Sequence, residues 1–115
     1  MAPQYNLGDV VFFYFPNDNP KTKDAEPNTL RRVLIVEVLS HEEYSVACIT
    51  KHKYHVGINR GYWVEANSDT GKKMRLDVDS FINLDDIKPL KWYYMRNKIG
   101  YCDIIDQILE DLGLS

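Results

Sequence analysis

The segment from Thr50 to His55 gathers a hydroxyl, two ammonium groups, two imidazoles and a phenol ring within six positions. Its members are Thr50, Lys51, His52, Lys53, Tyr54 and His55. Hydroxyl, ammonium and imidazole groups donate hydrogen bonds to phosphate oxygens, and imidazole also transfers protons near neutral pH. A tyrosine ring can stack on an unpaired base, a contact worth ~1–3 kcal/mol in proteins that bind single strands. The segment therefore predicts a site for a phosphate-bearing anion.

Two adjacent arginines, Arg31 and Arg32, open an apolar stretch that runs to Leu39. This stretch predicts a central strand over Arg31–Leu39, and the polar turn after it predicts a hairpin with a second strand over Tyr44–Thr50. In such a hairpin Arg31 lies near Thr50. Planar guanidinium donors match two phosphate oxygens at once. An anion at this edge would meet donors from both strands, although cations that only solvate the rim of a sheet would give the same pattern.

The remainder of the chain has the composition of short strands separated by polar turns. Strands are expected at Val10–Phe15, Tyr62–Ala66, Ser80–Leu84 with a continuation at Ile87–Leu90, and Lys98–Tyr101. A turn is expected at Asn67–Gly71, and the proline-rich segment from Pro16 to Thr29 predicts a long exposed loop. Alternation along the second hairpin strand places Tyr44, Val46, Cys48 and Thr50 on one face and Ser45, Ala47 and Ile49 on the other.

The C-terminal segment predicts one amphipathic helix. Asp103 can cap its N-terminus, and Gly113 suits the position just after its last residue. Its apolar stripe consists of Ile104, Ile105, Ile108, Leu109 and Leu112. The fold class is therefore mainly β, with about six short strands in a strongly curved sheet or small barrel closed by a C-terminal helix. Residues 1–115 are expected to form a single domain.

The composition, with 44% hydrophobic and 27% charged residues among 115, is that of a folded domain. The longest apolar run, Val10–Phe15, is too short to span a membrane, and the first residues do not form a secretion signal. With only two cysteines, the chain is expected to be cytoplasmic. The net charge of −3 hides an asymmetry, because residues 51–75 carry six cations against two carboxylates. This asymmetry predicts one face for an anion and another for a basic partner, although a solvated charged surface explains it as well.

Other reactive groups have spacings that fit no site. The pairs concerned are Asp85 with Asp86, Asp77 with Asp79, and His52 with His55. Adjacent strand residues point to opposite faces, and neither of the other pairs has the further ligands that calcium or zinc requires. Cys102 has no histidine nearby and is expected to be a packed thiol. Glycine-rich phosphate loops are absent from the sequence, so neither a metal nor a cofactor is expected.

The order of five short motifs resembles the MazF/PemK toxins of type II toxin–antitoxin systems. The motifs are Gly8–Val11 (GDVV), Arg31–Val36 (RRVLIV), Ala47–Thr50 (ACIT), Asp79–Ile87 (DSFINLDDI) and Asn97–Gly100 (NKIG). Together they cover nearly the whole chain in the order that the family has. The chain departs from the family pattern at Arg32, where the family has proline, and in residues 16–30, which contain no glycine.

The resemblance implies an SH3-like β-barrel that forms a homodimer and acts as a metal-independent, sequence-selective endoribonuclease on single-stranded RNA. A small antitoxin would neutralise it. In the family the 2′-hydroxyl attacks the adjacent phosphate and leaves a cyclic phosphate, and the functional arginine and threonine align with Arg31 and Thr50. Because a guanidinium stays protonated, we expect Arg31 and Thr50 to stabilise the transition state. His52 or His55 would then assist proton transfer, while Arg32, Lys51, Lys53, Tyr54 and His55 would bind the RNA.

The sequence is also compatible with two other functions. The chain could be a non-catalytic SH3-like module that binds nucleic acid or a peptide, with a groove lined by aromatic residues. Those residues would be Tyr62, Trp63, Trp92, Tyr93 and Tyr94, although core packing explains them equally well. The chain could also be a degenerate relative of the toxins that is kept for dimerisation or regulation.

Overall fold

The computed structural model describes residues 5–14, 30–53 and 56–114. Its elements are β1 (Asp9–Tyr14), β2 (Leu30–Val38), β3 (Glu43–Thr50), β4 (Gly61–Val64), α1 (Asp69–Met74), β5 (Ser80–Lys91), the 3-10 helix η2 (Trp92–Tyr94), β6 (Met95–Tyr101) and α2 (Ile105–Asp111). The fold is mainly β with a short C-terminal helix, as the sequence predicts. The expected loop from Pro16 to Thr29 lies outside the described residues.

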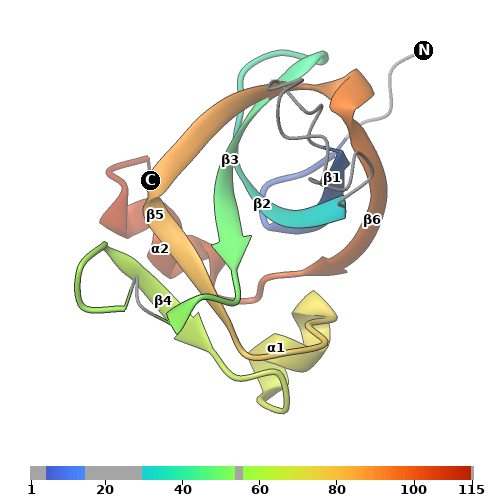
Figure 1. The fold of residues 1–115 in the computed structure, drawn as a ribbon. Coiled ribbons are helices and arrows are strands. Elements are labelled where there is room, and N and C mark those ends of the chain that lie inside the picture. Colours follow the sequence, from blue (N-terminus) through green and yellow to red (C-terminus); the bar gives the residue numbers. More distant parts are fainter. Residues whose placement is uncertain (1–4, 15–29, 54–55, 115) are drawn as a thin grey trace, which may run out of the picture.

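The six strands form one antiparallel sheet in the order β4-β5-β3-β2-β1-β6. The strands from β5 to β6 curve round a common interior, and both α-helices lie outside this curve (Figure 1). Irregularities in the β1–β6, β2–β3 and β3–β5 pairings accompany the curvature, because an unpaired residue bends and twists its strand. In the described part of the chain β4 and β6 remain the two edges, so the sheet is not closed into a barrel.

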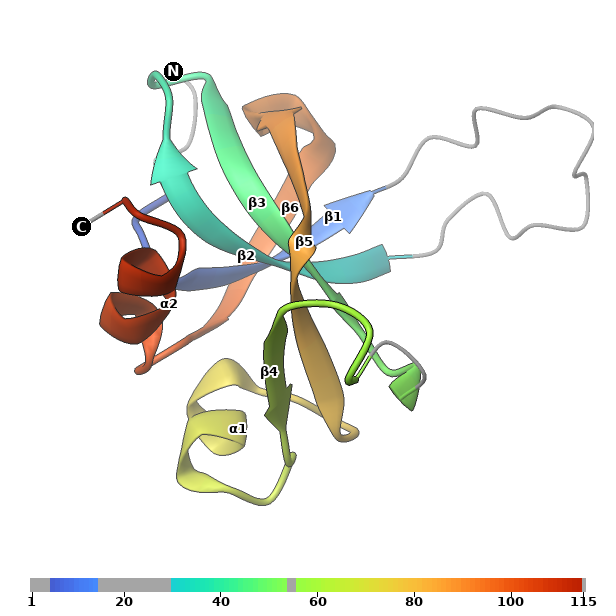
Figure 2. The ribbon, with the colours of Figure 1, turned by 90° about the vertical axis from the view of Figure 1, so that its left-hand side faces the viewer.

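The long strand β5 contains a three-residue offset against β3. Ala47 pairs with Ile87, yet the next residue, Cys48, pairs with Asn83. The residues between, 84–86, are therefore extra on β5, and beyond them the strand pairs with β4 as well as with β3 (Figure 2). Asp85 anchors this offset, because its carboxylate accepts hydrogen bonds from the backbone N–H and the Nε of Arg60, at 2.7 and 2.9 Å.

Two apolar clusters pack on opposite faces of the sheet. The first joins the outer face to the helices and includes Val10, Leu34, Ala47, Ile49, Met74, Ile105 and Ile108. The second fills the interior of the curve and includes Tyr5, Val11, Phe13, Val33, Ile35, Tyr44, Val46 and Met95. The alternation expected for the second hairpin strand is confirmed, because Tyr44 and Val46 belong to the inner cluster while Ala47 and Ile49 belong to the outer one.

The helix α2 matches its predicted stripe, since Ile105, Ile108 and Leu109 are buried and Gly113 follows the helix with φ +73°. The expected N-cap is wrong. Asp103 does not cap α2, because its carboxylate accepts hydrogen bonds from the Thr70 hydroxyl and the Lys73 ammonium at 2.8 and 3.1 Å. The cost of leaving the first turn uncapped is offset by a contact that ties α2 to α1.

The turn expected at Asn67–Gly71 is confirmed only at its start, where the backbone N–H of Ser68 donates a hydrogen bond to the Glu65 carbonyl at 3.1 Å. From Asp69 onward the prediction is wrong, because the chain forms α1. The Ser68 side chain accepts a hydrogen bond from the backbone N–H of Gly71 and so caps the helix. Met74 is completely buried in the outer cluster and holds the helix against the sheet. No helix in the described ranges is long and apolar enough to cross a membrane.

Candidate functional site

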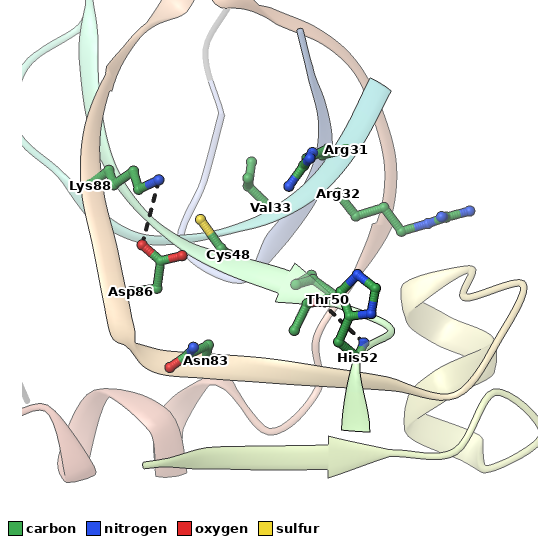
Figure 3. Close-up of a pocket in the computed structure, with 10 residues that line it drawn as sticks. Arg31, Arg32, Val33, Cys48, Thr50, His52, Asn83, Asp86 and Lys88 are labelled. Carbon is green, nitrogen blue, oxygen red and sulfur yellow. Dashed lines mark hydrogen bonds and ion pairs between the residues drawn. The ribbon is translucent and has the colours of Figure 1, made fainter. Parts of the chain in front are cut away.

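A pocket of about 260 Å³ opens where β2 begins and β3 ends, beside the offset of β5. Its lining consists of Arg31, Arg32, Val33, Cys48, Ile49, Thr50, His52, Asn83, Asp86 and Lys88. Figure 3 shows these side chains arriving from β2, from β3 with the residues that follow it, and from β5. The sequence-predicted residues Arg31, Arg32, Thr50 and His52 are therefore brought together.

The register of the hairpin explains why Arg31 and Thr50 meet. Val33 pairs with Cys48, and the same antiparallel register two residues further places Arg31 opposite Thr50. Side chains directly opposite each other in antiparallel strands share a face. Both residues continue the face of the inner cluster beyond its last apolar members, and their polar groups line the pocket where that cluster ends.

Thr50 and His52 are linked by a local turn. The Thr50 hydroxyl oxygen accepts a hydrogen bond from the backbone N–H of His52 at 3.2 Å (Figure 3). This bond uses the lone pair of the hydroxyl and leaves its O–H able to donate to a ligand. The side chain of His52 is exposed and lines the same pocket. A hydroxyl donor and an imidazole therefore flank the space that Arg31 lines.

Arg32 is held in a different way from Arg31. Its Nη1 lies 3.2 Å from the Asp77 carboxylate, and its guanidinium lies 5.2 Å from the centroid of the Phe12 ring. These contacts hold the partly exposed side chain so that its guanidinium points away from Arg31 and the other lining side chains (Figure 3). Because Asp77 pairs with Arg32, this carboxylate has a structural partner.

The expected lysines do not line the pocket. Lys51 and Lys53 are exposed in the segment after β3, and the Lys53 ammonium lies 5.5 Å from the centroid of the Trp63 ring. Tyr54 and His55, the other two residues predicted for this site, lie outside the described residues. The lysines therefore flank the pocket on the side that leads toward β4.

Three polar lining residues come from β5 and were not predicted from the sequence. Asp86 and Lys88 form an ion pair at 3.6 Å, and buried Asn83 accepts a hydrogen bond from the backbone N–H of Asp85 at 2.9 Å. The β5 offset separates Asp85, which bonds to Arg60, from Asp86, which lines the pocket. Alternation along Asp86 and Lys88 was a usable signal, but only the β3–β5 pairing, in which Lys88 lies opposite Val46, places them on the face of the sheet that carries Thr50.

The thiols in the described chain are not reactive. Burial raises the pKa of Cys48 to about 11, and the Coulombic effect of Asp86 and a hydrogen bond to it add to the rise. Burial likewise raises the pKa of Cys102 to about 11, and this side chain is completely buried, in agreement with the packed thiol expected from the sequence. Both thiols are protonated at neutral pH, so Cys48 lines the pocket as a neutral group.

The lining has an excess of positive charge. Arg31 and Lys88 are set against the single carboxylate of Asp86, which leaves one net positive charge, while the Arg32 guanidinium is paired with Asp77 outside this balance. A small pocket with this balance suits one phosphodiester group, since each anionic oxygen can accept from a charged donor. Within the described ranges no three His, Cys, Asp or Glu side chains gather as metal ligands.

The aromatic residues considered for a binding groove are divided between two places. Tyr62 and Trp63 lie on β4, which pairs with the first residues of β5. Trp92–Tyr94 form η2, which follows the last residue of β5. Trp92 and Tyr94 pack against the inner cluster. The five residues therefore do not line one common groove.

No protein-family model matches the chain, and no curated protein has significant similarity to it. The resemblance to the MazF/PemK toxins therefore stays a prediction from the sequence motifs.

Proposed function

We propose that the chain is a metal-independent endoribonuclease that cleaves single-stranded RNA in a sequence-selective manner. We propose for it the SH3-like barrel architecture and homodimeric state of the MazF/PemK toxins, with a small antitoxin as its inhibitor. The small, strongly curved antiparallel sheet followed by a C-terminal helix supports the architecture.

The observation that carries the proposal is the convergence of Arg31, Thr50 and His52 on one pocket. These residues belong to two strands and the segment that follows, and the motifs that suggested RNA cleavage name the same arginine and threonine. Charge supports the same substrate class, because the cations Arg31 and Lys88 outnumber the one carboxylate in the lining.

The reaction needs donors for the phosphate oxygens and groups that move two protons. The 2′-oxygen loses a proton and attacks phosphorus, the P–O5′ bond breaks, and the 5′-oxygen gains a proton. Arg31, Lys88 and the Thr50 hydroxyl donate hydrogen bonds to the oxygens on which charge builds up. Asp86 on β5 accepts the proton from the 2′-hydroxyl, and His52 in its protonated form donates a proton to the departing 5′-oxygen. The neutral Cys48 thiol takes no part in proton transfer.

The proposal is tested with purified protein and a long single-stranded RNA transcript in the presence of EDTA. Cleavage should continue, and the products should carry a 5′-hydroxyl that polynucleotide kinase can label directly. Arg31→Ala should lower kcat/KM by roughly 100- to 1,000-fold, the usual loss when one transition-state donor is removed. The kcat/KM of Arg31→Lys, which keeps the charge but not the planar fork, should lie between the values for the wild type and Arg31→Ala.

Expression in cells supplies a second readout. The wild-type chain should arrest growth, Arg31→Ala should relieve the arrest, and Lys91→Ala, an exposed cation at the end of β5 away from the pocket, should not. RNA binding without cleavage would instead assign the chain as a non-catalytic binding module. Equal cleavage by the wild type and Arg31→Ala would overturn the proposed site.

A further inference from the structure

A continuous row of side chains crosses the sheet through the pocket. Trp63 on β4 pairs with Phe81 on β5, and Phe81 pairs with Thr50 on β3. The hairpin register continues the row to Arg31, which pairs with Phe13 on β1. Because residues directly opposite one another share a face, Trp63 lies on the same face of the sheet as Thr50 and Arg31.

Burial along β4 agrees with this assignment. Val64 belongs to the outer cluster and Tyr62 packs against it, so these two residues face the helices. Trp63 lies between them in sequence and therefore points to the opposite face. Its side chain is only partly buried, whereas Phe13, at the other end of the row, is 2% exposed. The Trp63 ring, on the β4 side of the pocket, is therefore accessible to a ligand, whereas the Phe13 ring, on the β1 side, is not.

The segment after β3 connects Trp63 to the pocket a second time. It carries Thr50 and His52, which line the pocket, and then Lys53, whose ammonium lies 5.5 Å from the centroid of the Trp63 ring. A cation over an aromatic face shows that this face is accessible to a group from solvent. The exposed Lys53 side chain can move from the ring to a neighbouring phosphate, because its four-carbon stem is flexible.

We propose that Trp63 is a stacking platform for the nucleobase next to the cleaved phosphate, on the side of the pocket that leads to β4. This inference rests on the proposed ribonuclease function and adds a base-binding subsite to it. Adjacent strands lie ~4.8 Å apart, so Trp63 is roughly 10 Å from Thr50 across the sheet, a separation that one nucleotide can span. The base displaces Lys53 from the ring, and Lys53 then pairs with the phosphate of that nucleotide.

The other aromatic residues near the pocket are already engaged. The Arg32 guanidinium covers the Phe12 ring, Phe81 is buried, and Tyr62 donates a hydrogen bond to Asp111. In the described part of the chain, Trp63 is therefore the ring on this face that a base can reach. Base stacking on a tryptophan tolerates every base, so this subsite would add affinity more than sequence selectivity.

Tryptophan fluorescence tests the subsite, because the chain contains only Trp63 and Trp92. In Trp92→Phe all tryptophan emission comes from Trp63, and in Trp63→Phe all comes from Trp92, which packs against the inner cluster. The probe is a 2′-O-methylated RNA oligonucleotide of the sequence cut most efficiently in the transcript, which binds but has no 2′-hydroxyl to attack. Binding should quench Trp92→Phe strongly and Trp63→Phe little.

The affinity of the same probe supplies the second measurement. Trp63→Leu should weaken its binding by roughly 5- to 150-fold, the range expected for the loss of one stacked base. Removing only the base that stacks on Trp63, by an abasic position in the probe, should weaken the wild type equally and Trp63→Leu hardly at all. Circular dichroism reports whether Trp63→Leu has folded, and the quenching experiment does not depend on that variant.

The outcomes separate the two proposals. Cleavage by the wild type together with unquenched binding to Trp92→Phe would overturn the stacking platform and leave the ribonuclease in place. Equal loss of affinity at every abasic position in both proteins would also overturn it. A folded wild type that neither cleaves nor binds RNA would overturn the ribonuclease and the subsite together.

Discussion

At the scale of single residues, His52 decides how the site moves protons. Its imidazole lines the pocket beside Thr50 and opposite Asp86, and imidazole changes its charge between pH 5 and 8. We expect His52→Gln to lower kcat by roughly 100- to 10,000-fold and to change the shape of the pH–rate profile, because glutamine cannot transfer a proton. The remaining activity should depend on pH only through other groups.

The profile is measured from pH 5 to 8 with kcat and KM determined separately. Asp86→Asn should also lower kcat, because an amide cannot accept the proton of the 2′-hydroxyl. If the profile of His52→Gln has the same shape as that of the wild type, a group other than His52 transfers the proton.

Sequence reasoning identified the local part of the site and missed the distant part. Arg31, Thr50 and His52 could be found because β2 and β3 are consecutive strands of one hairpin, so the start of β2 lies beside the end of β3. The shift in register between Ile35 and Glu37, which places Arg31 rather than Arg32 opposite Thr50, could not be predicted from the turn. Asp86 and Lys88 reach the pocket through the pairing of β5 with β3, which joins residues far apart in sequence. No alternation pattern contains the three-residue offset that turns Asp86 inward and Asp85 toward Arg60, since the offset depends on the register of both neighbours.

At the scale of elements, the contact between Asp85 and Arg60 fixes the segment before β4 to the offset of β5. Hydrogen bonds from the backbone and side chain of Arg60 lower the pKa of Asp85. A lowered pKa in the folded state means that the ionised carboxylate stabilises the fold above its unfolded-state pKa, and that this stability disappears as the pH falls through the folded-state value. Asp85→Asn should therefore be less stable than the wild type at pH 6, and the difference should shrink below about pH 4.

Urea unfolding midpoints at pH 6, 4 and 2.5 test this prediction. Glu65→Gln, which also removes one exposed carboxylate, is the matched control and should differ little from the wild type at any of these values. A gap for Asp85→Asn that persists unchanged at pH 2.5 would mean that the variant acts through something other than loss of the charge.

Gly100 determines how closely α1 approaches β6. A Cβ at this position would lie 2.5 Å from the Lys73 carbonyl oxygen and 2.7 Å from the Met74 carbonyl carbon. Both atoms belong to the backbone of α1, so the helix itself would have to move. We expect Gly100→Ala to lower the free energy of unfolding by about 1–3 kcal/mol, the usual cost of overpacking. Asn97→Ala, an exposed position on the same strand, should change it by less than ~0.5 kcal/mol.

Thermal or urea denaturation measures both variants. The prediction fails if Gly100→Ala is as stable as Asn97→Ala, which would mean that α1 is not held tightly on β6.

The helix α1 could not be predicted from the sequence for a local reason. Six residues that include a glycine and a threonine have weak helix propensity, and the helix depends on the Ser68 cap and on burial of Met74. For the strands predicted from apolar runs, the predicted ends lie within three residues of the ends in the structure.

At the scale of the whole molecule, charge limits where RNA can lie. The chain is acidic overall, but the segment 51–75 carries a net positive charge. This segment contains the residues after β3, the strand β4 and the helix α1, and β4, which carries Trp63, lies beside β5 (Figure 2). An RNA strand that leaves the pocket toward β4 meets cations, whereas most of the remaining surface repels it. Single strands release counterions when cations neutralise their phosphates, so the slope of log K against log salt reports the number of contacts.

We therefore expect Lys51→Ala and Lys53→Ala each to reduce the steepness of that slope by about 0.7, and the double variant by about 1.4, if each lysine contacts one phosphate. The non-cleavable 2′-O-methylated RNA, titrated between 50 and 300 mM salt on the scale of ordinary binding assays, gives the slopes. Lys91→Ala is the control, because Lys91 is half-exposed, pairs with Glu43 at 3.4 Å and lies at the other end of β5. Its slope should equal that of the wild type. A reduction with Lys91→Ala as large as with Lys53→Ala would show that the RNA contacts the protein without regard to the pocket, and the direction of the strand toward β4 would then be wrong.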